Sequence, residues 1–335
     1  MRLLRKEIGL ITDMLGEKMK KMISLIIPCF NEEAGLGILY EALNNVAASM
    51  EDCYDFEFLL IDDGSEDRTL EKIQAFAEND SRIHYISFSR NFGKEAAMYA
   101  GFCYAKGDYV TVMDSDMQDP PSLLPKMVEI LEQGEYDSVA TRRVTRKGEP
   151  PIRSFFARLF YKIINRISDA NVVDGARDFR LMTRPMVDTI VSMSEYNRFS
   201  KGIFGWIGFK TFWLPYENIE RVAGETKWSF WKLFNYSLDG IINFSQVPLV
   251  ISAWAGFFFV MLSILATIFV VLRKAVYGGS VEGWASLVCV ILFVGGVQLF
   301  CTGVLGLYLA KTYQEVKRRP HYIISKSNVK KTKEQ

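Results

Sequence analysis

Two carboxylates that lie one residue apart, at the end of an apolar run, are the chemical centre of this sequence. The run Tyr109–Met113 leads directly into Asp114 and Asp116, and Gln118 follows. Aspartates inside a strand are costly unless they are paired or coordinated, so we expect both where the strand leaves its sheet. Carboxylate and amide oxygens suit Mg²⁺ or Mn²⁺, and a nucleotide diphosphate would complete the coordination. An ordinary polar junction between strand and loop is the alternative.

The segments around these carboxylates alternate between strand and helix patterns. Short apolar runs predict five strands, at Ile23–Pro28, Phe56–Ile61, Ile83–Ser87, Tyr109–Met113 and Tyr136–Ala140. Helical patterns follow the first four strands and end near Ser49, Ala77, Ala105 and Gln133. This order predicts an α/β fold with a mostly parallel sheet and helices on both of its faces.

Polar clusters follow four of the predicted strands. They are Asn31-Glu32, Asp62-Asp63, Arg90-Asn91 and the Asp114–Asp116 segment. Ligands of such sheets bind at the carboxyl ends of the strands, and parallel strands bring those ends to one edge. Four clusters at one edge predict a site of nucleotide size, which favours the metal interpretation of the two aspartates over the polar junction.

Composition excludes several other classes of protein. The chain has 335 residues and a net charge of +1, from 40 basic and 39 acidic residues, which argues against a nucleic-acid-binding protein. Its five cysteines lack metal-ligand spacing and form no recognisable disulfide framework, and two histidines are too few for a histidine-based site. A reducing, cytoplasmic setting fits the polar part of the chain.

Two long uncharged apolar runs, Val247–Leu272 and Ser286–Ala310, predict transmembrane helices. Each exceeds the roughly 20 residues that cross a bilayer. The tail that follows is far more basic than the connection between the runs, which predicts a cytoplasmic tail. Two crossings then return the N-terminal part to the same side, so we expect a multi-pass protein of the plasma (inner) membrane with both termini in the cytoplasm.

Other segments carry the pattern of helices that lie on a membrane. Residues 153–167 place apolar residues on one face and basic residues on the other, and 226–246 are rich in aromatic residues. A helix docked on the sheet would show the same stripe. The predicted organisation is a leader (1–21, a short amphipathic helix or a disordered segment), a catalytic domain (22–225), a juxtamembrane helix (226–246), two membrane helices (247–310) and a basic tail (311–335).

Five motifs in order carry a resemblance to a known family. They are Pro28–Glu32, Asp62–Thr69, Arg90–Glu95, Asp114–Pro121 and Arg221–Lys227. Together they resemble the polyprenyl-phosphate glycosyltransferases of glycosyltransferase family 2, which include dolichol-phosphate mannose synthases and bactoprenol glucosyltransferases. The likeness runs from about Ile23 to the second apolar run. It implies a GT-A, Rossmann-like catalytic domain with interfacial helices and a two-span anchor.

The resemblance implies roles for named residues. The pocket for the nucleotide sugar corresponds to Pro28, Phe30, Glu32, Leu60, Asp62 and Ser115. The family often has tyrosine at the position of Phe30, so only packing is expected there. Asp114, Asp116 and Gln118 match the metal positions, and Arg142, Arg221 and Lys227 match basic residues that face phosphate. A guanidinium fork suits a pair of phosphate oxygens.

Asp174, with Asp178 as its competitor, matches an acidic residue near the acceptor in the family. A polyprenyl phosphate has a second pKa of about 6, so it is already largely dianionic at neutral pH. Little deprotonation is needed, and we expect Asp174 to position the acceptor rather than act as a general base.

The expected activity is inverting, metal-dependent transfer of a hexose from a nucleotide diphosphate sugar to polyprenyl (undecaprenyl) phosphate, which would serve cell-envelope glycan modification. The resemblance favours UDP-glucose or UDP-N-acetylglucosamine as donor, and it implies a homo-oligomer, often a tetramer. A processive polysaccharide synthase is one alternative, although the Gln-x-x-Arg-Trp signature of that class is absent from the sequence. A non-catalytic, membrane-anchored nucleotide-binding protein is another.

Overall fold

The computed structural model describes residues 20–143, 162, 164–168, 173, 175–216, 240–277 and 283–329. The eight strands in this part of the chain form one sheet, in the order β7-β5-β6-β4-β1-β2-β3-β8. Strands β1 (Lys21–Cys29), β2 (Tyr54–Asp62), β3 (Ile83–Phe88) and β4 (Tyr109–Val112) are parallel neighbours. The four predicted parallel strands are therefore confirmed, with bounds that shift by a few residues.

The half of the sheet beyond β4 mixes strand directions. Strand β6 (Ala176–Thr183) lies antiparallel between β4 and β5 (Ser138–Arg143), and β7 (Thr211–Tyr216) runs parallel to β5. The fifth predicted strand is thus confirmed as β5, but it does not pair with β4. The sequence analysis assigned no strand to β6 or β7.

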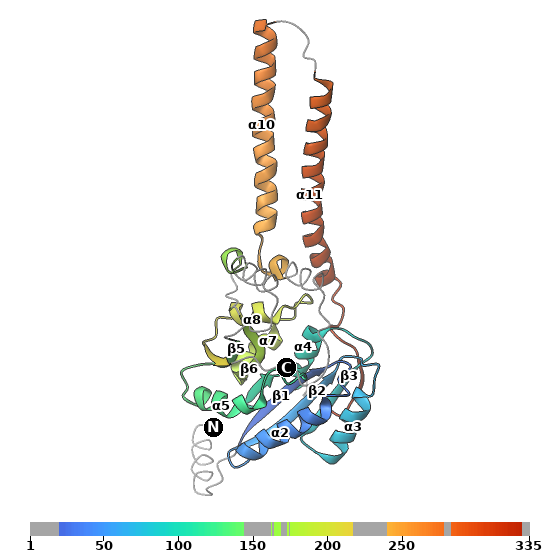
Figure 1. The fold of residues 1–335 in the computed structure, drawn as a ribbon, viewed down its shortest axis with the longest axis vertical. Helices are drawn as coiled ribbons and strands as arrows, with labels where there is room; N and C mark the ends of the chain where they lie inside the picture. The colour runs from blue at the N-terminus through green and yellow to red at the C-terminus, as the bar shows by residue number, and fades with distance from the viewer. Residues whose placement is uncertain are drawn as a thin grey trace, which may run out of the picture.

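Alternate side chains of the strands belong to two hydrophobic layers, one on each face of the sheet. Ile23, Leu25 and Ile27 of β1 pack on one face with α2 (Leu36–Met50) and α5 (Leu124–Glu132), and α3 (Thr69–Asn79) lies on the same side. The buried residues of α2 recur at helical spacing: Leu36, Leu39, Leu43, Val46, Ala47 and Met50. The predicted mostly parallel α/β architecture is confirmed (Figure 1).

On the other face lie α4 (Lys94–Tyr104), α7 (Arg184–Ser192) and α8 (Ser200–Trp206), which pack on Ile26 of β1 and on Leu59 and Ile61 of β2. A short 3-10 turn, η1 (Pro121–Leu123), precedes α5. Helix α4 matters for the site because its first residue, Lys94, lies at the edge of the sheet where β4 ends.

The long helices α10 (Val247–Tyr277) and α11 (Trp284–Val316) project side by side from one end of the sheet domain (Figure 1). The apolar segments Val247–Arg273 and Val290–Val316 have mean hydropathies of 2.7 and 2.2, and neither is buried inside the structure. Both are long and apolar enough to cross a membrane, and their exposure differs from that of a core helix in a soluble protein, which is mostly buried. The two predicted helices are confirmed as elements of the fold, and both are candidate membrane spans.

The chain after α11 returns to the sheet. Strand β8 (Ile324–Ser327) pairs antiparallel with β3 at the far edge. Earlier, Glu315 near the end of α11 accepts hydrogen bonds from the backbone amides of Tyr196 (2.9 Å) and Asn197 (3.0 Å). Part of the predicted basic tail is therefore an edge strand, and the end of α11 lies against the sheet domain.

Parts of the predicted organisation lie outside the described residues. These are the leader apart from its last two residues, most of the helix at 153–167, residues 226–239 of the juxtamembrane segment and the last six residues of the tail.

Helix α4 approaches β1 so closely that a side chain at Gly101 would collide. A Cβ atom there would lie 2.1 Å from Cγ2 of Ile26. We predict that Gly101→Ala lowers stability by about 1–3 kcal/mol, the usual cost of overpacking a core. The measurement is the thermal unfolding temperature of the detergent-solubilised protein.

Gly37→Ala is the matched control, because Gly37 is an exposed residue of α2 with no atom near the added Cβ. This variant should be neutral or slightly more stable, since alanine favours a helix over glycine. Equal unfolding temperatures for the two variants would contradict the close packing of α4 on β1.

Candidate active site

The predicted carboxylates lie where β4 leaves the sheet. All four residues of β4 are buried, and the backbone amide of Met113 still donates to the carbonyl of Ile26 on β1 at 3.0 Å. Asp114 and Asp116 are then half-buried, whereas Ser115 between them is buried. The strand-end position that the sequence predicted for the two aspartates is therefore observed.

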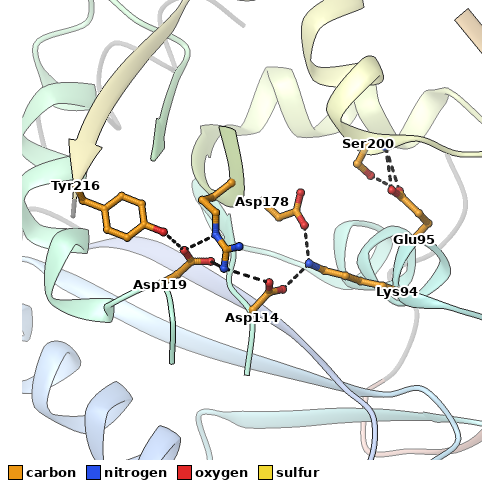
Figure 2. Close-up of polar contacts among 8 residues, drawn as sticks. Lys94, Glu95, Asp114, Asp119, Asp178, Ser200 and Tyr216 are labelled. Atoms are coloured by element: carbon orange, nitrogen blue, oxygen red, sulfur yellow. Dashed lines mark hydrogen bonds and ion pairs between the residues drawn. The ribbon is translucent and has the colours of Figure 1, made fainter. Parts of the chain in front are cut away.

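A lysine that the sequence analysis left without a role lies between two of the acidic residues. The Nζ atom of Lys94 lies 2.5 Å from Oδ1 of Asp114 and 2.5 Å from Oδ2 of Asp178 on β6 (Figure 2). Burial disfavours the charge of Lys94, but the two carboxylates outweigh it and raise the pKa of the ammonium. Lys94 therefore stays charged, and it joins the end of β4 to β6.

The loop before Lys94 is held by another carboxylate of the predicted polar clusters. Asp63, which follows β2, accepts hydrogen bonds from the backbone amides of Phe92 (2.7 Å) and Gly93 (2.9 Å). Next to Lys94, Glu95 accepts from the amide of Ser200 and from its hydroxyl at 2.5 Å, which ties α4 to α8 (Figure 2). The start of α4 is thus fixed from two sides.

Arg177 of β6 fixes the other side of Asp114. Its guanidinium donates to both oxygens of Asp119, from Nε at 2.9 Å and from Nη2 at 3.2 Å, and Nη2 lies 3.8 Å from Oδ2 of Asp114. Asp119 is fully buried and also accepts a hydrogen bond from the Tyr216 hydroxyl at 2.7 Å. Figure 2 shows the resulting chain of contacts from Tyr216 to Asp178. Asp114 therefore lies between two cations.

The oxygen atoms at this edge can hold a divalent cation only if a bound substrate supplies further oxygen ligands. Asp114 and Asp116 offer hard oxygen ligands, and Oδ1 of Asp116 accepts from the amide of Gln118 at 3.2 Å. Among the described residues no group of three or more His, Cys, Asp or Glu side chains is arranged to hold a metal. A bound diphosphate would supply the missing oxygens, and a cation that binds Asp114 must compete with Lys94.

Most of the residues predicted to contact the nucleotide lie at or just after the ends of β1 and β2, which end side by side because Cys29 pairs with Asp62. Pro28, Phe30 and Glu32 are half-buried, and Ser115 is buried nearby in the chain after β4. Leu60 is a core residue, and both oxygens of Asp62 accept hydrogen bonds, from the Ser87 hydroxyl (2.7 Å) and the Ser65 amide (3.1 Å). Leu60 and Asp62 are therefore packed into the ends of the strands, and their contact with a nucleotide stays a prediction.

The predicted phosphate-facing and catalytic residues are only partly within the described chain. Arg142 is exposed at a bulge near the end of β5, where it pairs with Ala176. Asp178 is ion-paired with Lys94, as described above. Asp174, Arg221 and Lys227 lie outside the described residues, so their roles remain predictions from the resemblance.

Sequence reasoning overlooked the basic residues of β6 and α8. Arg177, Arg180 and Lys201 line a cavity between these elements, next to the Asp178 carboxylate. Charged and apolar residues alternate only along Asp178–Leu181, which is a short strand signal that could have revealed β6. Lys94 lies in the Arg90–Glu95 motif, but its pairing with Asp114 and Asp178 gave no local signal, because these partners are distant in the sequence.

Removal of Lys94 tests whether its ammonium competes with a metal for Asp114. We predict that Lys94→Met binds Mn²⁺, in the presence of UDP, about two- to fivefold more tightly, because a partly exposed ion pair is worth up to about 1 kcal/mol. Electron paramagnetic resonance of free Mn²⁺ measures the affinity. Lys106→Met is the control, since the ammonium of Lys106 lies 3.9 Å from Glu57, away from Asp114. Unchanged or weaker binding in Lys94→Met would contradict the competition.

Comparison with known proteins identifies relatives that are similar over most of this chain. CsbB from Bacillus subtilis (strain 168) is 43% identical over 308 residues, which cover 92% of each chain. The bactoprenol glucosyl transferase of Shigella phage SfII and a prophage bactoprenol glucosyl transferase homolog from Escherichia coli (strain K12) are each 40% identical, over 91% of this chain and 98% of theirs.

A more distant solved structure is glucosyl-3-phosphoglycerate synthase from Mycobacterium tuberculosis in complex with Mn²⁺, UDP-glucose and phosphoglyceric acid. It is 18% identical with a TM-score of 0.44, over 66% of this chain and 78% of that one. The family model for glycosyl transferase family 2 matches residues 24–191, which include α4, the end of β4 and all of β6. With the relatives above, this match shows that the chain belongs to glycosyl transferase family 2 and is a glycosyltransferase.

Proposed function

We propose that this glycosyltransferase moves a hexose from a UDP-sugar to the phosphate of a membrane-embedded polyprenyl phosphate. The observation that carries the proposal is the position of Asp114, between Lys94 and Arg177 at the ligand-binding edge of a sheet that is attached to two long apolar helices. The relatives named as bactoprenol glucosyl transferases support the choice of acceptor. UDP-glucose is the first donor to test, and UDP-N-acetylglucosamine the second.

On the donor side, Asp114, Asp116 and Gln118 would hold Mg²⁺ or Mn²⁺ together with the diphosphate. When bound, such an ion acts as a Lewis acid that stabilises the charge of the departing nucleotide diphosphate. Arg177 contributes a fixed positive charge beside Asp114, and its paired contacts with the buried Asp119 hold it in place. Arg142, Arg221 and Lys227 add the positive charge that two phosphate groups need in order to approach each other.

On the acceptor side, the phosphate oxygen attacks the anomeric carbon as the bond to the diphosphate breaks, which inverts the configuration of that carbon. A general base works best when its pKa is near the working pH. Burial opposes the charge of Asp178, but Lys94 and Lys201 outweigh it and hold the pKa of this carboxyl well below its usual range. This supports a positioning role for Asp178, and we extend the same role to Asp174.

The attachment to the membrane supports an acceptor that remains in the bilayer. The end of α11 contacts residues just before α8, and β8 joins the same sheet, so both lie with the catalytic domain on one side of the two spans. The lysine- and arginine-rich tail favours the cytoplasm for that side. Association into a homo-oligomer stays a prediction, which the mass of the detergent-solubilised protein would test.

The two alternatives differ in what they require of the site. A processive synthase would use the same donor site and make a polymer. A non-catalytic nucleotide-binding protein has no need of Lys94 and Arg177 beside Asp114. The arrangement of charges favours a transferase over the second alternative, and the size of the product separates the transferase from the first.

Turnover requires both carboxylates at the end of β4. Detergent-solubilised protein should release UDP from UDP-glucose only when undecaprenyl phosphate and Mg²⁺ or Mn²⁺ are both present. Asp116→Asn should lower this rate at least about a hundredfold, because loss of metal assistance removes several kcal/mol of transition-state stabilisation. Asp52→Asn, an exposed residue remote from the site, is the control. Retained activity in Asp116→Asn would contradict the donor site.

The role of Asp174 can be read from two substitutions. If it positions the acceptor, Asp174→Asn should keep most of the UDP-release rate, because the amide still offers polar contacts, whereas Asp174→Ala should lose it. If Asp174 is a general base, both variants should lose the UDP-release activity equally, since an amide cannot accept the proton. Initial rates at saturating donor decide between these outcomes.

A further inference from the structure

One buried cation in the sheet has no direct hydrogen-bond or ion-pair partner among the described residues. Arg180 of β6 is 3% exposed, and no hydrogen bond or ion pair joins its guanidinium to another residue that the structure describes. Its Nε atom is buried without a partner. Burial lowers the pKa of this arginine to about 10, although the nearby Asp178 carboxylate acts in the opposite direction. A buried charge is costly unless it is paired, so this position calls for an anion.

The surroundings of Arg180 compensate for only part of this cost. Its guanidinium carbon lies 4.3 Å from the centre of the Phe204 ring on α8 and 5.4 Å from the centre of the Trp213 ring on β7. Contacts of this kind contribute about 0.5–2 kcal/mol, which is less than the cost of an isolated buried charge. Asp178, two residues earlier on the same strand, is already in contact with Lys94.

Arg180 lines a cavity of about 200 Å³ that has a consistent chemical character. Arg177 and Lys201 line it as well, and no described carboxylate does. The aromatic rings of Phe204, Phe209 and Trp213 form much of the remaining wall. Three cations among aromatic rings match a ligand that joins an anionic group to an apolar chain.

The cavity adjoins the candidate donor site through Arg177. Arg177 is one of the lining residues, and its guanidinium lies 3.8 Å from Asp114 and is fixed by Asp119. Lys201, on the other wall, acts electrostatically on Asp178. An anion in the cavity would therefore lie on one side of Arg177 and the carboxylates that serve the donor on the other.

We propose that Arg180 and Lys201, with Arg177, form the pocket that binds the phosphate of the lipid acceptor, and that the rings of Phe204, Phe209 and Trp213 contact the first part of its apolar chain. The inference rests on the proposed function, because it assigns the acceptor of that reaction to a place. The guanidinium fork of Arg180 pairs with two phosphate oxygens, and the ammonium of Lys201 supplies a second charge to the dianion. Acceptor binding thus supplies the counter-ion that Arg180 lacks.

Direct binding of farnesyl phosphate, a short prenyl monophosphate, tests the pocket without any turnover. The full chain in an uncharged detergent is titrated by calorimetry. Arg180→Met should weaken binding by at least about tenfold, the size expected for a lost charged hydrogen bond. Lys201→Met should weaken it less. Lys210→Met is the matched control, because Lys210 is an exposed lysine that lies over the Tyr136 ring outside the cavity, and it should bind as the unchanged protein does.

Unfolding temperatures separate binding from a structural role. Because the charge of Arg180 is unpaired, Arg180→Met should unfold at the same or a higher temperature without ligand, and farnesyl phosphate should no longer raise that temperature. A lower unfolding temperature with an unchanged ligand effect would mean that Arg180 is structural and would overturn the proposal. If Arg180→Met does not fold, Arg180→Lys and Lys201→Met carry the same test.

Competition identifies the source of the phosphate. Dioctanoyl phosphatidylglycerol or inorganic phosphate that displaces farnesyl phosphate at equal concentration would show a site for headgroups or free phosphate, and would overturn the acceptor assignment. If Arg180→Met binds farnesyl phosphate as tightly as the unchanged protein and still uses undecaprenyl phosphate as acceptor, the pocket is disproved and the proposed function remains intact. Binding that depends on Arg180, in protein that transfers no sugar, would support the pocket and disprove the function.

Discussion

The ammonium group of Lys94 between Asp114 and Asp178 is the interaction on which the rest of the site depends. It joins the end of β4, the start of α4 and strand β6, three elements that are far apart in the sequence. Without a cation at this point, two half-buried carboxylates would face each other across the edge of the sheet, and like charges at short range repel strongly. The positions of Asp114 and Asp178 in the candidate site follow from this balance of charge.

The same balance explains how one small region could serve two anionic substrates. Asp114 and Asp116 are the negative groups that suit a metal–diphosphate complex, while Arg177, Arg180 and Lys201 are the positive groups that suit a phosphate. Arg177 lies next to both sets of groups. Its two hydrogen bonds to the fully buried Asp119 hold its guanidinium in place. The α11 contacts with Tyr196 and Asn197 keep this region near the two candidate membrane spans, where the proposed lipid acceptor would arrive.

Short sequence patterns predicted those elements of the fold that are determined by the residues of one segment alone. Buried apolar runs revealed β1 to β4, and Asp114 and Asp116 were placed at a strand end because a strand interior would not tolerate them. Strand β6 was missed because charged residues break its apolar run, and β8 was missed because it contains only one apolar residue, Ile324, and is held by backbone pairing with β3. The Lys94–Asp178 pair spans 84 residues, so no local pattern could have predicted it.

Mass spectrometry of the lipid product tests the central claim most directly. The full chain is incubated with UDP-glucose, undecaprenyl phosphate and Mg²⁺ or Mn²⁺, and the lipid fraction is analysed by mass. The account predicts one new species, undecaprenyl monophosphate that carries a single hexose. A lipid that carries a polymer, a sugar linked through a diphosphate, or no new lipid with any UDP-sugar or GDP-sugar would contradict it.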